Sequence, residues 1–157
     1  MNKLSTVSIA LLMSIPLQLY AGNAFNFQVV LSGDNEVPPV VTDTSGTAIF
    51  HVNNSLTEIN FKLDIRDADN VLGAAGAHLH CAPAGANGSV VVFLAGSFPP
   101  GYDGDLQLRG TLNDGSFVNS ACGTNIAELV DSMLDGNVYL NVHSTAVPSG
   151  VIRGQVQ

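Results

Sequence analysis

The sequence predicts an all-β domain, a β-sandwich or Greek-key barrel, with one short helix. Apolar and polar residues alternate with a period of two through most of the chain after residue 24. Turn residues, rich in glycine and proline, separate these stretches, and only one stretch has the spacing of a helix. The length of 157 residues favours a single domain.

The N-terminal segment, residues 1–24, has the pattern of a secretory signal peptide. Lys3 gives a short positive start, a mostly apolar run covers residues 7–19, and small residues precede the expected cleavage point. The run is too short for a stable membrane span. We therefore expect an exported protein, secreted or periplasmic, whose mature domain covers residues 25–157.

Eight stretches of the mature chain are expected to form strands. The clearest is 58–66, where four apolar residues alternate with polar ones, and 89–94 has the composition of a more fully buried strand. The eight stretches are 25–31, 46–52, 58–66, 77–80, 89–94, 106–112, 138–143 and 151–156. One helix is expected over 126–134, with Asn125 as its N-cap and Gly136 just after its end.

Two cysteines, Cys81 and Cys122, both fall in the exported part of the chain. An even pair in an oxidising compartment most simply forms a disulfide. The alternative is a pair of thiolate metal ligands. Because Cys81 directly follows His80, its side chain should point to the opposite face of the strand, and this favours the disulfide.

The charge balance excludes several classes of partner. Removal of Lys3 with the signal peptide leaves four basic residues against thirteen acidic ones, a net charge of −9. The chain has no cluster of lysine and arginine, so nucleic-acid binding and attraction to anionic membranes are disfavoured. No hydrolase signature is present either, and no residue is assigned a catalytic role.

Three of the four histidines are candidate ligands of one metal ion. His78 and His80 are two apart on a predicted strand, so both rings project from one face, about 7 Å apart at Cα, within reach of one metal ion. His143 ends a strand whose apolar residues claim the core, so it faces away from the core with Tyr139 and Asn141. The three imidazoles are therefore expected on the polar outer surface of the sheets.

Three neutral imidazoles without a thiolate suit copper or, second, zinc. Tyr139 and Asn141 could hold an imidazole by a hydrogen bond, and His51 could add a further ligand. The alternative is that these side chains belong to a solvated face, because an H-x-H pair is a weak signal by itself. Asp34 and Glu36 precede a Pro-Pro pair and suit a turn better than a metal site.

The chain resembles the CHRD domain family, first recognised in chordin and found in secreted bacterial proteins. The resemblance covers nearly all of the mature chain and implies a β-sandwich, but it implies little about activity. The blocks that carry it, in order, are LSGDNEVPP (31–39), AHLHCAPAGANG (77–88), GNVYLNVHS (136–144) and PSGVIRGQ (148–155).

A weaker resemblance links the histidines to Cu/Zn superoxide dismutases, which are Greek-key sandwiches with copper on an outer face. The similarity implies that His78, His80 and His143 lie where three copper ligands would lie. The bridging histidine and the remaining zinc ligands have no match in this chain. Arg153 is a candidate for the arginine that guides the anionic substrate only by its place near the last strand.

The sequence therefore favours a CHRD protein that binds copper, or zinc, through His78, His80 and His143 in metal binding or handling. A surface at −9 has the wrong sign for steering an anion, which disfavours dismutation. Two alternatives stay open: a copper-dependent oxidoreductase similar to superoxide dismutase, and a structural or adhesive extracellular domain without metal. The sequence identifies no protein partner.

Overall fold

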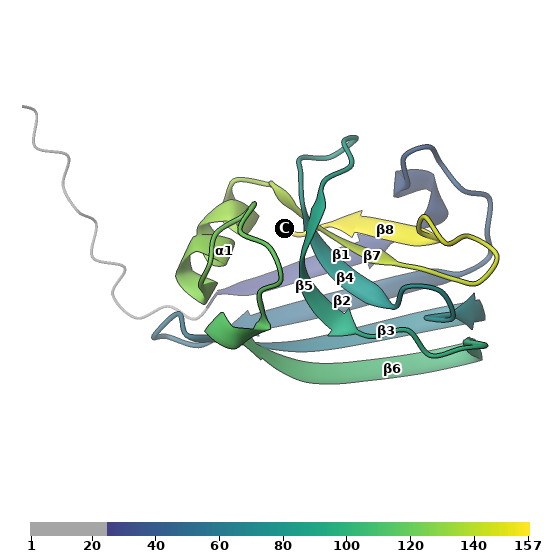
Figure 1. The fold of residues 1–157 in the computed structure, drawn as a ribbon, viewed down its shortest axis with the longest axis horizontal. Coiled ribbons are helices and arrows are strands. Elements are labelled where there is room, and N and C mark those ends of the chain that lie inside the picture. The colour runs from purple at the N-terminus through teal and green to yellow at the C-terminus, as the bar shows by residue number, and fades with distance from the viewer. Residues whose placement is uncertain (1–24) are drawn as a thin grey trace, which may run out of the picture.

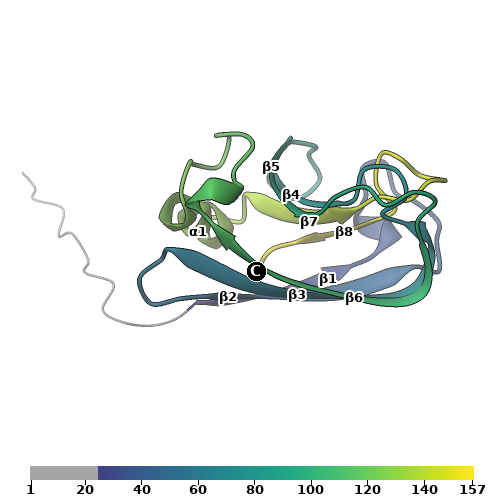
Figure 2. The ribbon, with the colours of Figure 1, turned by 60° about the horizontal axis from the view of Figure 1, so that its bottom comes forward.

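Two antiparallel four-stranded sheets pack face to face in the computed structural model, which describes residues 25–157 (Figures 1 and 2). The predicted signal peptide lies outside the described residues. The first sheet has the order β1 (Asn26–Leu31), β2 (Ser45–Val52), β3 (Glu58–Val71) and β6 (Tyr102–Asn113). The second has the order β5 (Ser89–Ala95), β4 (Ala77–Cys81), β7 (Val138–Val142) and β8 (Ile152–Gln155).

The chain passes between the sheets in Greek-key fashion, because β6 returns to pair with β3 and β7 returns to pair with β4. On one side the sheets are joined, since backbone hydrogen bonds link Gln28 of β1 to Gln157 and Ser32 to Arg153 of β8. The predicted all-β sandwich is confirmed, with every expected strand present. The largest differences are in β3 and β6, which extend beyond the expected 58–66 and 106–112.

The core lies between the sheets and comes from the alternation in the sequence. Strands β1 and β2 bury every second residue, and the β3 residues predicted to face inward are also buried. Helix α1 (Ile126–Leu134) covers one end of the sandwich (Figure 1) with its predicted apolar stripe. Asn125 caps it by accepting a hydrogen bond from the Glu128 backbone at 3.0 Å, as expected.

Strand β5 differs from its prediction as a more fully buried strand. It lies at the edge of the second sheet, and only Val91 and Val92 are fully buried, whereas Phe93 is 47% exposed. An apolar run does not distinguish an edge strand from a central one, because the strand's neighbours come from distant parts of the chain.

The predicted disulfide is confirmed. Cys81 at the end of β4 is bonded to Cys122 before α1, with 5.5 Å between the Cα atoms. It links the second sheet to the segment that leads into the helix.

Among the described residues, no helix has the length and apolar character needed to cross a membrane.

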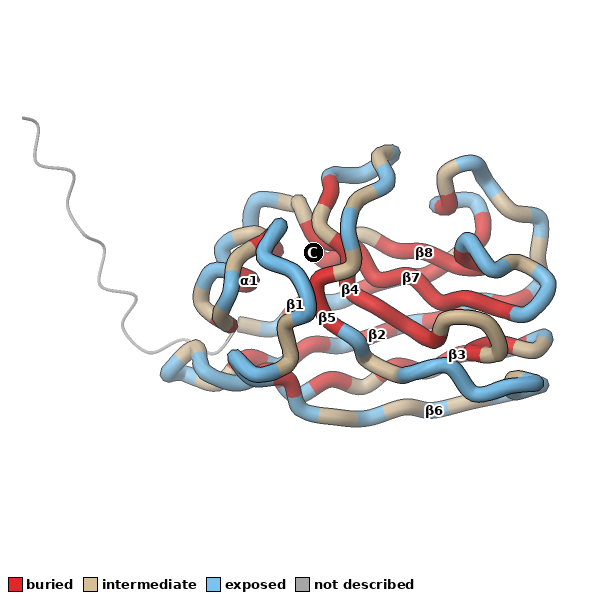
Figure 3. Tube along the Cα trace, viewed as in Figure 1, coloured by how far each residue is buried: buried red, intermediate tan, exposed pale blue. Residues whose placement is uncertain are grey.

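The central strands of the second sheet are buried on both faces. All residues of β7 and nearly all of β4 and β8 are buried (Figure 3), unlike the alternating strands of the first sheet. Loops fold over the side of this sheet that faces away from the core. The histidines are on that side, so the polar outer face predicted for them is in fact enclosed.

Candidate metal centre

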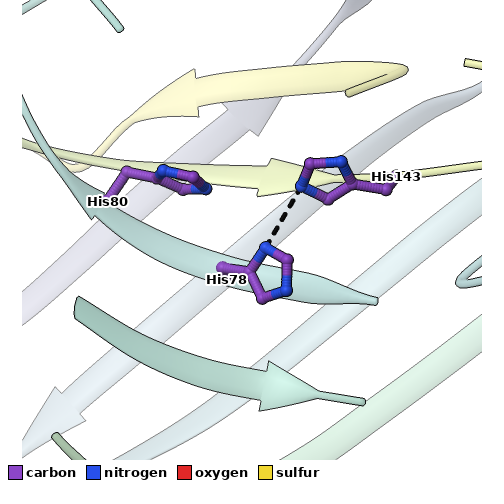
Figure 4. A group of neighbouring side chains, drawn as sticks. All are labelled: His78, His80 and His143. Carbon is purple, nitrogen blue, oxygen red and sulfur yellow. Dashed lines mark hydrogen bonds between the residues drawn. The ribbon is translucent and has the colours of Figure 1, made fainter. Parts of the chain in front are cut away.

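The three predicted histidines meet on the outer side of the second sheet. His78 and His80 project from β4 and His143 directly follows β7, the neighbouring strand (Figure 4). If one ring nitrogen is taken from each histidine, the three nitrogens lie within 4.8 Å of one another. The predicted convergence of the three imidazoles is therefore confirmed.

In two of the three rings, a backbone carbonyl determines which nitrogen keeps a lone pair that can bind a metal. His80 Nδ1 lies 3.0 Å from the Gly88 carbonyl oxygen, and His143 Nδ1 lies 2.8 Å from that of Pro148. Because a carbonyl only accepts hydrogen bonds, each Nδ1 carries the proton and each Nε2 keeps its lone pair. A carbonyl that accepts the proton of one ring nitrogen is typical of histidines that ligate metals through the other nitrogen.

The third ring faces one of those lone pairs. His78 Nδ1 lies 3.1 Å from His143 Nε2. Without a metal, His78 therefore donates its Nδ1 proton to His143. Two buried nitrogens then have no hydrogen-bond partner, Nε2 of His78 and Nε2 of His80. Buried polar atoms are seldom left unpaired, so the cluster has an unmet capacity for a ligand.

The site is enclosed, which corrects the expectation of a surface site. His78, His80 and His143 are only 3%, 9% and 7% exposed. The ring of Phe93 meets that of His78 edge-on at 4.4 Å, and Tyr139 stacks on His80 at 4.7 Å with 9° between the planes. The sequence showed that these histidines avoid the core, but not that loops cover them.

Burial keeps the cluster neutral. It lowers the pKa of His78 to about 4, with the neighbouring His143 adding to the shift and a backbone interaction with Ala75 opposing it. Burial likewise lowers the pKa of His80 and of His143, although the Gly88 and Pro148 carbonyls act in the opposite direction. At pH 7 all three imidazoles are neutral, as metal ligands must be.

A buried polar pair lies beside the histidines. Asn141, opposite His78 on β7, donates from Nδ2 to Glu36 Oε1 at 2.6 Å, and its own Oδ1 has no partner. Glu36 is 6% exposed, and burial raises its pKa to about 7 even though Arg153 and Asn141 lower it. Gly150 leaves room for this pair, since a Cβ there would lie 2.1 Å from Asn141 Nδ2.

The structure separates the predicted additional residues. Tyr139 and Asn141 lie at the site, as described above. His51 does not: it is exposed on β2 of the other sheet, where its Nδ1 contacts the Asn26 side chain. The suggestion that His51 adds a ligand is therefore wrong, because β2 and β4 belong to different sheets.

Several supporting residues were not recognised from the sequence. Glu36 was assigned to a turn only, and the carbonyl groups of Gly88 and Pro148 give no signal in a sequence pattern. Arg153 was considered only as a guide for substrate. A signal did exist, because each of these residues belongs to one of the blocks that carried the family resemblance, and the four blocks meet around the histidines.

Comparison with known proteins gives one match. The CHRD domain family model matches residues 27–156, nearly all of the described chain. No curated protein and no solved structure matches the chain. The resemblance to Cu/Zn superoxide dismutases therefore gains no support from these two comparisons. With a family model that covers this much of its length, the chain belongs to the CHRD domain family.

Proposed function

We propose that this CHRD protein binds one copper ion, with zinc as the second choice, through His78, His80 and His143, and that it serves in metal binding or handling. The observation that carries the proposal is the enclosed cluster of neutral imidazoles, whose ligand atoms lie within 4.8 Å of one another and in which His80 Nε2 has no hydrogen-bond partner. A cluster that was purely structural would be expected to pair this nitrogen within the protein.

The spacing of the nitrogens supports this function. Two nitrogens that each lie about 2.0 Å from a tetrahedral ion are about 3.3 Å apart. His78 Nδ1 and His143 Nε2 are 3.1 Å apart. All the ligand atoms lie within 4.8 Å of one another, so the widest pair has to close by no more than about 1.5 Å. We expect rotation of the side chains to supply this change.

The donor set supports copper before zinc. An all-imidazole set suits both metals, and Cu²⁺ binds more tightly than Zn²⁺ at a given site of nitrogen ligands. Once bound, copper would supply redox chemistry, and zinc would supply only Lewis acidity. The enclosed rings and the net charge of −9 expected for the mature chain favour holding a cation over admitting an anionic substrate.

Export is part of the proposal. The bond between Cys81 and Cys122 is compatible with an oxidising compartment, and the predicted signal peptide points in the same direction. A metal carrier outside the cytoplasm also meets copper and zinc without competition from the reduced thiols of the cell interior.

Titration with metal tests the proposal. Cu(II), Cu(I) and Zn(II) are added to metal-free wild type, His143→Ala and His51→Ala, and binding is measured by calorimetry and by competition with chelators. We expect one ion per chain in wild type, a loss of at least about 100-fold in affinity for His143→Ala, since a ligand is worth more than the 10–100-fold of its outer-shell partners, and no change for His51→Ala. Equal stoichiometry and affinity in His143→Ala would contradict the proposed site.

The same samples distinguish the alternative functions. Superoxide removal by the copper-loaded protein above the level of free copper would favour an oxidoreductase over a carrier. A protein that takes up no metal, and whose stability ignores chelators, would favour a structural or adhesive domain.

A further inference from the structure

We infer that Arg153 is a positioning residue of this metal site: it fastens the loop of residues 82–88 so that the Gly88 carbonyl fixes the ring of His80. The inference rests on the proposed function, because it assigns a role in metal binding to a residue that touches no ligand nitrogen. Its first test, however, needs no metal.

The guanidinium of Arg153 holds the loop at three points. From β8, Nη2 donates to the Ala86 carbonyl at 2.7 Å and to the Pro83 carbonyl at 3.4 Å, and Nη1 donates to Asn87 Oδ1 at 3.0 Å. Asn87 in turn donates from Nδ2 to the Val37 carbonyl at 2.9 Å. One planar group with several donors therefore sets the path of the loop over the sheet.

The end of this loop controls His80. The Gly88 carbonyl accepts the His80 Nδ1 proton at 3.0 Å, and the Gly88 backbone N–H donates to the Tyr139 hydroxyl at 3.2 Å. Only glycine fits here, because a Cβ would lie 1.9 Å from the Cys81 carbonyl oxygen. If the loop moves, His80 loses the acceptor that keeps its proton on Nδ1 and its lone pair on Nε2.

The same guanidinium also supports His80 from the side. Its central carbon lies 3.4 Å from the centroid of the Tyr139 ring, and Tyr139 stacks on His80. Because β7 lies between β4 and β8, the tyrosine ring lies between the cation and the imidazole. The contact is a cation–π interaction away from solvent, where such interactions are strongest.

The surroundings of Arg153 exclude two common roles of arginine, the guidance of an anion from solvent and a direct ion pair. It is 2% exposed, so it does not guide an anion from solvent, a role for which it was a candidate only by its place near the last strand. Within residues 25–157 the direct ion pairs are Lys62 with Asp64 and Arg66 with Asp105, and Arg153 acts on an acid only at longer range, where its charge lowers the pKa of Glu36. A buried cation is costly unless its donors are paired, and here they pair with the carbonyls and the Asn87 side chain of the loop that ends at Gly88.

Substitution Arg153→Lys tests the inference, with Arg66→Lys on the exposed pair as the matched control. Lysine keeps the charge but loses the planar group and its stacking. In metal-free protein, nitrogen NMR of the imidazoles reports which nitrogen carries the proton. We expect His80 to lose its fixed Nδ1–H form in Arg153→Lys, whereas His143, which is held by Pro148 in another loop, keeps its own.

Metal binding is the second readout. We expect the affinity of Arg153→Lys for Cu(II) to fall by about 10–100-fold, and that of Arg66→Lys to stay at the wild-type value. If Arg153→Lys does not fold, Asn87→Ala replaces it, because Asn87 is exposed and carries only one of the three loop contacts. We then expect a smaller loss of the Nδ1–H form of His80 and a smaller decrease in Cu(II) affinity.

A folded variant in which both the protonation of His80 and the affinity match wild type would overturn the inference. A wild type that binds no metal would overturn the proposed function instead, and the NMR result would still decide the role of Arg153.

Discussion

Replacing Glu36 by glutamine should change how the stability of the metal-free protein depends on pH. Glu36 lies beside the histidine cluster, 6% exposed and hydrogen-bonded to Asn141 at 2.6 Å. Glutamine keeps the oxygen that accepts this bond but cannot ionise. It therefore isolates the free energy of holding an ionisable carboxyl group in this position.

The magnitude follows from the pKa of Glu36, which is raised from 4.5 in the unfolded chain to about 7. The folded state binds more protons than the unfolded state between these two values, so wild type loses stability as the pH rises from 4.5 to 7. At about 1.4 kcal/mol per pH unit, the loss reaches on the order of 3 kcal/mol. The Glu36→Gln variant does not lose this stability, because glutamine does not ionise.

Urea denaturation of both proteins at several pH values between 4.5 and 7.5 measures the effect, with Glu58→Gln on the exposed end of β3 as a control. The difference in free energy of unfolding, variant minus wild type, should increase by up to about 3 kcal/mol from pH 4.5 to pH 7. Parallel curves for the two proteins would refute the reasoning, because they would mean that Glu36 titrates normally.

Four further predictions concern the histidine cluster and the structure around it. Because burial lowers the pKa of His78 to about 4, the protein should retain metal well below pH 6.5 and release it only as the pH approaches 4. Release near pH 6.5 in a chelator assay would contradict this. Conversely, stability of the metal-free protein that depends on neutral His78 is present above pH 6.5 and lost as the pH falls towards 4, which acid titration of wild type and Glu36→Gln can measure. Phe93→Ala removes the ring over His78 and should speed metal removal severalfold in stopped-flow exchange, while His143→Ala, not Phe93→Ala, abolishes the site. Reducing the bond between Cys81 and Cys122, 41 residues apart, should lower the free energy of unfolding by about 4 kcal/mol, and an unchanged urea midpoint would count against this.

The sequence was sufficient for the fold class and the histidine set. Alternation with period two determined which residues of β1, β2 and β3 face the core, and the cap and stripe of α1 gave its bounds as observed. The same rule placed His78 and His80 on one face and turned His143 away from the core, whereas its place beside them was implied only by the resemblance to superoxide dismutases. These predictions depend on local periodicity, and local periodicity is what a single sequence contains.

The enclosure of the site by loops could not be predicted from the sequence, and the reason is physical. Whether a polar face meets solvent depends on loops that arrive from elsewhere, here residues 33–39, 82–88 and 144–150, and loop paths depend on long-range contacts such as those of Arg153. The error over His51 has the same origin, because period two gives the face of a strand but not the sheet that it joins.

Crystals of the protein loaded with copper, measured on both sides of the copper absorption edge, test the central claim most directly. We expect one anomalous peak per chain, about 2.0 Å from His78 Nδ1, His80 Nε2 and His143 Nε2. Full occupancy of copper elsewhere on the chain, with the three imidazoles still in mutual contact and no peak between them, would contradict it.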